Sequence, residues 1–162
     1  MSQKKLLIVI LIAAVGGGLW LRNYLSPEAA AKRELASMVS SFEQESLLRT
    51  MSSISRSYSD PFGLNYEILG GYLNEAMETY EDLDVDLIIT GVEVGEERVV
   101  IGVRFILWGS SDGSRGYVLG SLSDPCTADL EWRKETPGWR FASTLDLDIP
   151  ELQDQLERRR TR

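Results

Sequence analysis

The sequence predicts an α+β fold in which N-terminal helices are followed by one antiparallel sheet. Apolar residues recur at helical spacing up to about Tyr80, and from Leu83 onward they alternate with polar residues in the period of a strand. The strands follow one another without intervening helices, which argues against βαβ order. A strongly curved sheet wrapped around the long first helix would bury the apolar stripes of both.

An apolar segment precedes this domain. Lys4 and Lys5 are followed by the uncharged run Leu6–Leu21, and extension to Leu25 gives 20 residues, enough to cross a bilayer. We therefore predict a single-pass transmembrane anchor over residues 1–25. Basic residues favour the cytoplasmic side, so we expect the N-terminus inside the cell and the domain outside the cytoplasm.

The same segment also fits a cleaved signal peptide. A basic start, the apolar stretch Leu6–Val15 and the small residues Gly16–Gly18 match the three parts of such a peptide. Against cleavage, the apolar residues Leu19–Leu21 would remain at the new terminus. The alternative to an anchored protein is therefore a freely secreted domain.

The first predicted helix starts at Ser26. The run Ser26-Pro27-Glu28 combines an N-cap, a proline at the first helical position and an acid in the first turn. The helical period continues to Tyr58, with a break near Glu43–Ser46. A turn at Asp60–Gly63 ends this region.

A further helix is predicted over Leu64–Tyr80, where one face is apolar. Its adjacent glycines, Gly70 and Gly71, weaken the helix and indicate close packing or a kink at that point. The predicted strands cover Leu83–Val94 with a bulge near Gly91, Arg98–Trp108, Gly116–Leu122, Cys126–Arg133 and Trp139–Leu147.

These patterns divide the chain into three parts. The anchor covers residues 1–25, the α+β domain covers residues 26–148, and a short helix with a basic tail covers residues 149–162. About 140 residues remain after the apolar segment, which suffices for one domain with a buried core. The polar stretch Ser110–Arg115 is predicted as a hairpin connection rather than a phosphate-binding loop, and Thr136–Gly138 as a tight turn.

Charge and composition exclude several classes of function. Subtracting Lys4, Lys5 and Arg22 from the 17 basic side chains leaves 14 against 25 acidic ones, a net charge of −11. Such a surface repels phosphates, so we expect no binding of nucleic acid. The chain has no histidine and one cysteine, Cys126, which removes the usual general base and any zinc site built from these residues. We expect no metal and no cofactor.

The order of elements resembles the nuclear transport factor two-like superfamily, which includes ketosteroid isomerase-like proteins. Three passages carry the likeness: the helical start up to Tyr58-Ser59-Asp60, the hairpin Leu83–Trp108, and the ending from Ala128 through Gly138-Trp139-Arg140-Phe141. The resemblance implies a cone-shaped sheet around the helices, with a cavity between them. Dimers formed through the sheet face, common in this superfamily, are expected here as well.

The candidate binding residues are Tyr58, Asp60, Trp108, Trp132 and Phe141, which we expect to line the pocket. Structural roles are the simpler alternative for each, as a packed aromatic or as an Asp in a proline turn. Catalytic residues cannot be assigned, because the base and oxyanion positions of isomerase-like relatives do not map onto this sequence.

Other polar motifs favour structural roles. The alternating acids Asp82, Asp84 and Asp86 are typical of a solvated strand face rather than a calcium site. The single thiol of Cys126 is expected to be buried.

Two functional hypotheses follow. The preferred one is a membrane-anchored, extracytoplasmic binding or scaffold module for a protein partner or a small apolar ligand. The alternative is an isomerase- or hydratase-type enzyme with a buried carboxylate in the cone cavity, since such chemistry runs on Asp and Tyr without histidine. The absence of a catalytic motif favours the non-enzymatic hypothesis.

Overall fold

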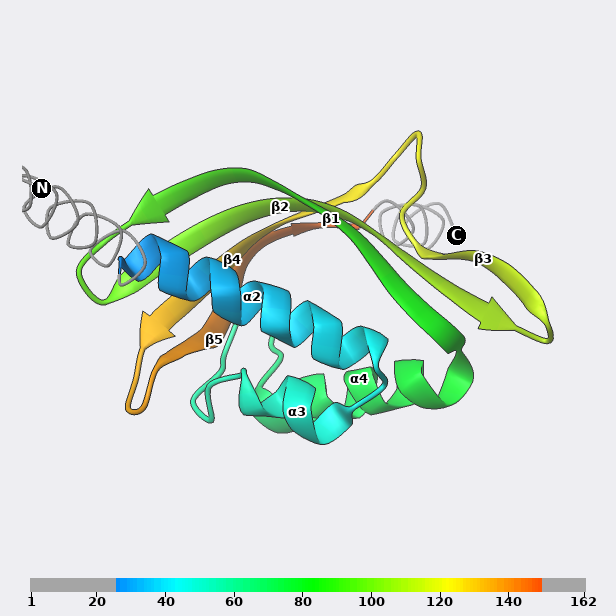
Figure 1. Ribbon diagram of the computed structural model, residues 1–162, viewed down its shortest axis with the longest axis horizontal. Coiled ribbons are helices and arrows are strands. Elements are labelled where there is room, and N and C mark those ends of the chain that lie inside the picture. Colours follow the sequence, from blue (N-terminus) through cyan, green and yellow to red (C-terminus); the bar gives the residue numbers. More distant parts are fainter. Residues whose placement is uncertain (1–25, 150–162) are drawn as a thin grey trace, which may run out of the picture.

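The computed structural model describes residues 26–149, in which helices precede strands as predicted (Figure 1). The helices are α2 (Pro27–Glu43), α3 (Leu47–Ser52) and α4 (Tyr66–Thr79). The strands are β1 (Glu81–Val94), β2 (Arg98–Ser111), β3 (Ser114–Leu119), β4 (Cys126–Lys134) and β5 (Trp139–Asp148). The predicted break between the first two helices is confirmed.

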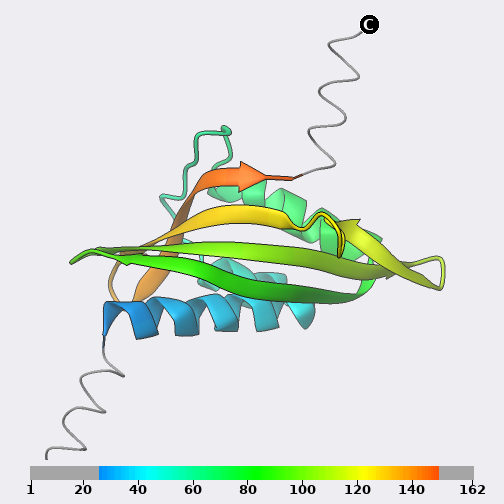
Figure 2. The same cartoon turned by 90° about the horizontal axis from the view of Figure 1, so that it is seen from above.

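All strand pairs are antiparallel, and β2 is the centre of the sheet. The order is β1-β2-β4-β5, and β3 pairs with the C-terminal end of β2 while β4 pairs with its N-terminal part. The register of β1 against β2 shifts between Ile89 and Gly91, where the bulge was predicted. The sheet curves over the helices, with α2 running along its length (Figures 1 and 2).

Local sequence explains how α2 begins. The Ser26 hydroxyl accepts a hydrogen bond from Ala29 N at 3.2 Å, and Pro27 occupies the first helical position. Ala31 and Leu35, one turn apart, are buried against the sheet.

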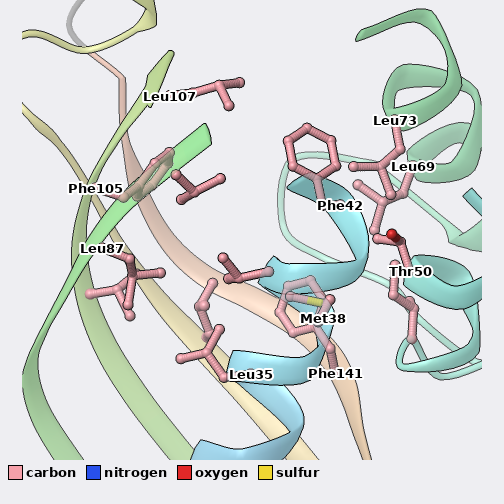
Figure 3. A pocket seen from close by; sticks show the side chains of 15 residues that line it. Leu35, Met38, Phe42, Thr50, Leu69, Leu73, Leu87, Phe105, Leu107 and Phe141 are labelled. Atoms are coloured by element: carbon pink, nitrogen blue, oxygen red, sulfur yellow. The ribbon is translucent and has the colours of Figure 1, made fainter. Parts of the chain in front are cut away.

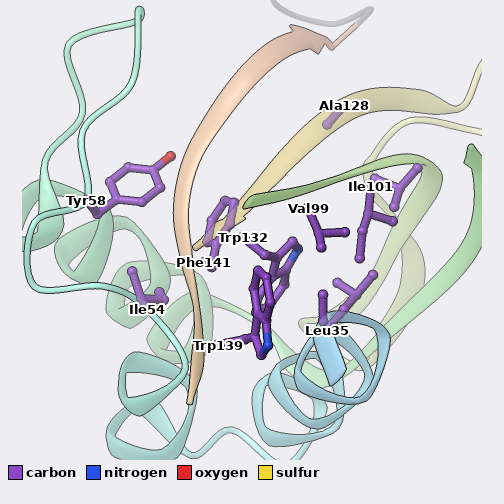
Figure 4. Packing of buried hydrophobic residues seen from close by; sticks show 11 residues of the cluster. Leu35, Ile54, Tyr58, Val99, Ile101, Ala128, Trp132, Trp139 and Phe141 are labelled. Atoms are coloured by element: carbon purple, nitrogen blue, oxygen red, sulfur yellow. The ribbon is translucent and has the colours of Figure 1, made fainter. Parts of the chain in front are cut away.

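The hydrophobic core is concentrated at the end of the domain where α2 begins. Trp132 is fully buried there, and its ring lies 5.6 Å from the ring of Phe141 (Figure 4). Alternate residues of β2 face the same core, which the strand period requires. The buried cluster contains Ala31, Leu35, Ile54, Tyr58, Val99, Ile101, Val103, Ala128, Trp132, Trp139 and Phe141.

The other face of β2 is also partly covered, as its apolar composition indicated. Val100 and Ile106 are both buried, although they point away from the helices. Opposite Val100 on β4 lies Glu131, a buried carboxylate that forms ion pairs with Arg98 and Arg133.

One predicted helical segment is wrong. The chain leaves the helix after Ser52 and forms a short parallel bridge to β5 at Ile54, before a turn at Arg56–Ser57. Ser55 N donates to Phe141 O at 2.8 Å, and Phe141 N donates to Ser53 O at 2.9 Å. The segment is rich in serine, which favours backbone hydrogen bonds outside helices. Ile54 and Tyr58 are still buried, because the edge strand β5 provides both a backbone partner and a core for them.

The predicted hairpin connection at Ser110–Arg115 is confirmed, and it is tight. Strand β2 continues to Ser111 and β3 begins at Ser114, so only two residues form the turn. Asp112 and Gly113 have φ values of 52° and 75°. This Asp-Gly pair is the sequence that two-residue hairpin turns prefer.

Between residues 26 and 149, no helix has the length and apolar character needed to cross a membrane. The predicted anchor over residues 1–25 and the predicted C-terminal helix lie outside the described residues, and both stay predictions.

Candidate functional site: an apolar cavity

A cavity of about 250 Å³ lies between the helices and the concave face of the sheet (Figure 3). Every helix and three strands of the described domain contribute to its wall, together with one residue of β5. The lining residues are Leu35, Met38, Val39, Phe42, Thr50, Ile54, Leu69, Leu73, Val85, Leu87, Val103, Phe105, Leu107, Leu130 and Phe141.

The wall offers almost no polar chemistry. Thr50 is the single polar residue among the fifteen, and its hydroxyl donates to Ser46 O at 3.0 Å. Carboxylate and basic side chains are absent from this lining. The cavity can therefore accept an apolar group but offers no side chain for acid–base catalysis.

The cavity lies where the residues of α2 that reach it have no tryptophan opposite. Met38, Val39 and Phe42 extend the stripe of Leu35 by one and two turns, so they continue along the same face of the helix. The buried cluster around the start of α2 contains Trp132 and Trp139, whereas around the cavity the sheet supplies only Val, Leu and Phe side chains.

Of the five predicted binding residues, Phe141 lines the cavity. Trp132 lies behind Phe141 in the packed core. Trp108 points to the opposite face of the sheet, where its ring lies 4.2 Å from the ring of Tyr117. The structure therefore brings Trp132 and Phe141 together and separates Trp108 from both.

Tyr58 and Asp60 form a buried polar pair away from the cavity wall. The Tyr58 hydroxyl donates to Asp60 Oδ2 at 2.8 Å and lies 3.0 Å from Thr144 Oγ1. Asp60 Oδ1 accepts from the backbone N–H groups of Phe62 and Leu64, at 3.0 and 2.9 Å. The carboxylate thus holds the turn that precedes α4.

Burial raises the pKa of Tyr58 to about 12, with the hydrogen bond to Asp60 acting in the same direction. The phenol therefore stays protonated at neutral pH and acts as a hydrogen-bond donor. The Tyr58 ring packs against Phe141, with ring centroids 5.1 Å apart, but neither Tyr58 nor Asp60 lines the cavity.

The remaining acids singled out in the sequence lie outside the cavity. Asp82, Asp84 and Asp86 are exposed, and Asp84 forms an ion pair of 2.6 Å with Arg115. Among residues 26–149, no cluster of acidic or thiol side chains has the arrangement of a metal site. Cys126 is buried, as predicted.

Sequence reasoning missed most of the cavity wall. The spacing of Met38, Val39 and Phe42 showed that they face inward, but periodicity alone does not distinguish a filled core from a hollow one. That difference depends on which strand residues lie opposite, and this requires the register of β1, β2 and β4.

Comparisons with known proteins support the fold. Neither a protein-family profile nor a curated protein sequence matches the chain. A nuclear transport factor two-like protein with a cystatin-like fold from Novosphingobium aromaticivorans superimposes with a TM-score of 0.61 at 10% identity, over 85% of this chain and 88% of its own.

Two further solved structures are similar. A domain of unknown function with a cystatin-like fold from Nostoc punctiforme gives a TM-score of 0.57 at 16% identity, over 80% of this chain and 83% of its own. A proposed scytalone dehydratase from Novosphingobium aromaticivorans gives 0.61 at 12% identity, over 74% and 81%. The described domain of this chain therefore has the nuclear transport factor two-like, cystatin-like fold.

Proposed function

We propose that the domain is a binding module whose cavity takes a small apolar ligand or a short apolar group of a larger one. The observation that carries the proposal is the cavity wall itself, in which Thr50 is the single polar residue. Burial of an apolar ligand in the cavity stabilises the complex by roughly 25 cal/mol for each Å² of apolar surface removed from water. A charged or strongly hydrogen-bonding ligand would lose its water contacts without replacement.

We further propose that residues 1–25 hold this module at a membrane, with the domain outside the cytoplasm. The support is the uncharged run Leu6–Leu21 behind Lys4 and Lys5. Extraction of membranes with alkaline carbonate should leave the full-length protein in the pellet. Recovery of an intact chain in the supernatant would contradict the anchor, and loss of the first residues from the mature protein would indicate a signal peptide.

The alternative is an isomerase- or hydratase-type enzyme, and a proposed dehydratase is among the similar structures. That chemistry needs a carboxylate beside the bound substrate. The buried acids Asp60 and Glu131 do not line the cavity, and both are engaged, one by Tyr58 and two backbone N–H groups, the other by two arginines. The geometry therefore supports binding better than proton transfer.

We also propose a homodimer formed through the outer face of the sheet. Ile88 and Tyr117 lie on this face and are 51% and 48% exposed. Chemical cross-linking of the full chain in detergent should give a dimer that Ile88→Asp removes. The same change at the exposed loop residue Leu122 should leave the dimer intact, and a monomer at high concentration would contradict the proposal.

Methionine methyl NMR of the full chain in phospholipid nanodiscs tests the binding function. Met38 lies in the cavity wall, whereas Met1 lies at the start of the N-terminal segment and serves as an internal reference. Naphthalene, an uncharged apolar probe, should shift the Met38 methyl signal in a saturable way. A Met38 signal that does not respond would contradict the proposal.

Two matched variants test whether naphthalene binds in the cavity. Val39→Phe places a ring into the cavity and should weaken naphthalene binding at least about tenfold, because the volume is occupied. Val94→Phe makes the same change at an exposed position at the end of β1 and should have no effect. Equal affinities for the two variants would place the probe elsewhere.

A further inference from the structure

Helix α4 differs from the other two helices in how it is held. None of its side chains is fully buried, whereas α2 buries Ala31 and Leu35 and the short α3 buries Thr50. Local opening of a helix has a low free energy when few buried contacts must be broken. By this criterion α4 is the element of the cavity wall that moves most readily.

The inner and outer faces of α4 explain its weak packing. Leu69 and Leu73 point into the cavity, facing Phe105 and Leu107 across the empty volume (Figure 3). On the outer face Ile68 and Tyr72 are exposed. Along α4, one layer of side chains lies between the partly open cavity and solvent.

Both ends of α4 are anchored. At the N-terminal end, the Arg56 guanidinium lies 4.5 Å from the centroid of the Tyr66 ring, and Asn65 caps the helix by accepting from Ile68 N at 2.9 Å. At the C-terminal end, Tyr80 packs directly against Gly109 of β2. These contacts confine any movement to the middle of the helix.

The middle of α4 is its weakest part. Gly70 and Gly71 each reduce helix stability by about 1 kcal/mol relative to alanine. A Cβ at Gly70 would lie 3.0 Å from Met51 Cε, so this glycine provides the close contact with α3. A Cβ at Gly71 would meet nothing within 4 Å, so packing does not account for the second glycine.

We propose that α4 is a gate of the apolar cavity: its middle turn unwinds at Gly70-Gly71 and lets the ligand pass between α4 and the sheet. This inference rests on the binding function proposed above. The two anchored ends return the helix to its closed position once the ligand is inside. Gly71 then has a role in ligand entry rather than in packing.

Hydrogen exchange of the full chain tests the movement without any ligand. Amides in the middle of α4, around Leu69–Leu73, should exchange at least about tenfold faster than those of Leu35–Val39 in α2. Gly71→Ala should slow exchange in this part of α4 by about two- to fivefold, since alanine favours the helix. Protection of α4 equal to that of α2 would overturn the gate.

Naphthalene kinetics, followed through the Met38 methyl signal in nanodiscs, test the role in ligand access. Gly71→Ala should slow association and dissociation by the same two- to fivefold factor, leaving the Kd within about twofold. The control Gly116→Ala, in β3 and also with open space around the added Cβ, should change neither rate. Unchanged rates in Gly71→Ala, with slowed exchange in α4, would overturn the gate and leave the binding function standing.

Failure of the binding function gives a different result from failure of the gate. If naphthalene leaves the Met38 signal unchanged in every variant while α4 still exchanges rapidly, the binding function fails, and with it the role of α4 in ligand access.

Discussion

The two ends of the helix–sheet interface have the same architecture but opposite packing. Near the start of α2, Ala31 lies in the same buried cluster as the fully buried Trp132, and the interior is filled. Three turns farther along the same helix, Phe42 borders an open cavity. The difference arises from side-chain size on the facing strands, since the backbone curvature is shared. Trp132 from β4 and Trp139 from β5 help to fill one end, and the other end is hollow.

The largest expected effect comes from opening the filled end. Trp132→Ala removes a fully buried ring from the core and should lower the free energy of unfolding by about 3–5 kcal/mol, because the surrounding residues cannot fill the space. Urea denaturation of the full chain in detergent measures the change. A loss below about 1 kcal/mol would show that this end is not the packed part of the domain.

The buried phenol of Tyr58 adds a pH dependence to the filled end. Its folded-state pKa of about 12 is above the unfolded value of 10.0, so the folded protein binds more protons between these values. Its contribution is complete below about pH 10 and is lost as the pH rises through 12, by about 3 kcal/mol in total. Tyr58→Phe should remove this slope from the stability curve. Identical slopes above pH 10 in the two proteins would contradict the assignment.

Truncation at the hollow end should cost much less. Leu73→Ala removes atoms that already border empty space on one side, so few contacts are lost. We expect a decrease of about 1 kcal/mol or less, against the 2–5 kcal/mol typical of a packed leucine. A decrease of 3 kcal/mol would mean that Leu73 is packed and that the cavity is filled in solution.

The smallest effect separates the two adjacent glycines of α4. Gly71→Ala should raise the free energy of unfolding by about 0.5–1 kcal/mol, because nothing obstructs the new methyl group. Gly70→Ala should raise the free energy of unfolding by less, since its methyl group requires the end of the Met51 side chain to move. Equal gains would show that the contact between α3 and α4 does not restrict this position.

The sequence predicted the strands of the sheet better than the segment that pairs with its edge strand β5. The strand period identified β1, β2, β4 and β5 to within a few residues, because each alternates between a core face and an outer face. It failed at Ile54–Tyr58, whose four-residue spacing fits a helix equally well. The decision depended on pairing with β5, a contact across more than 80 residues that local pattern does not contain.

The candidate site was less predictable than the fold. Aromatic character selected Tyr58, Trp108, Trp132 and Phe141, but only Phe141 reaches the cavity. Small and medium residues such as Val39, Val85 and Leu130 define the cavity because their side chains leave volume between the helices and the sheet empty. The sequence alone does not reveal this empty volume. A resemblance in fold could therefore predict that a cavity exists, but not its wall.

Xenon most directly tests whether one end of the domain is hollow and apolar, because it enters dry cavities and forms no hydrogen bonds. With the full chain in nanodiscs under xenon pressure, the Met38 methyl signal should shift in a saturable way, while in Val39→Phe the shift should be lost. Shifts of equal size in both proteins, or no shift at Met38, would contradict the hollow end on which the proposed binding function depends.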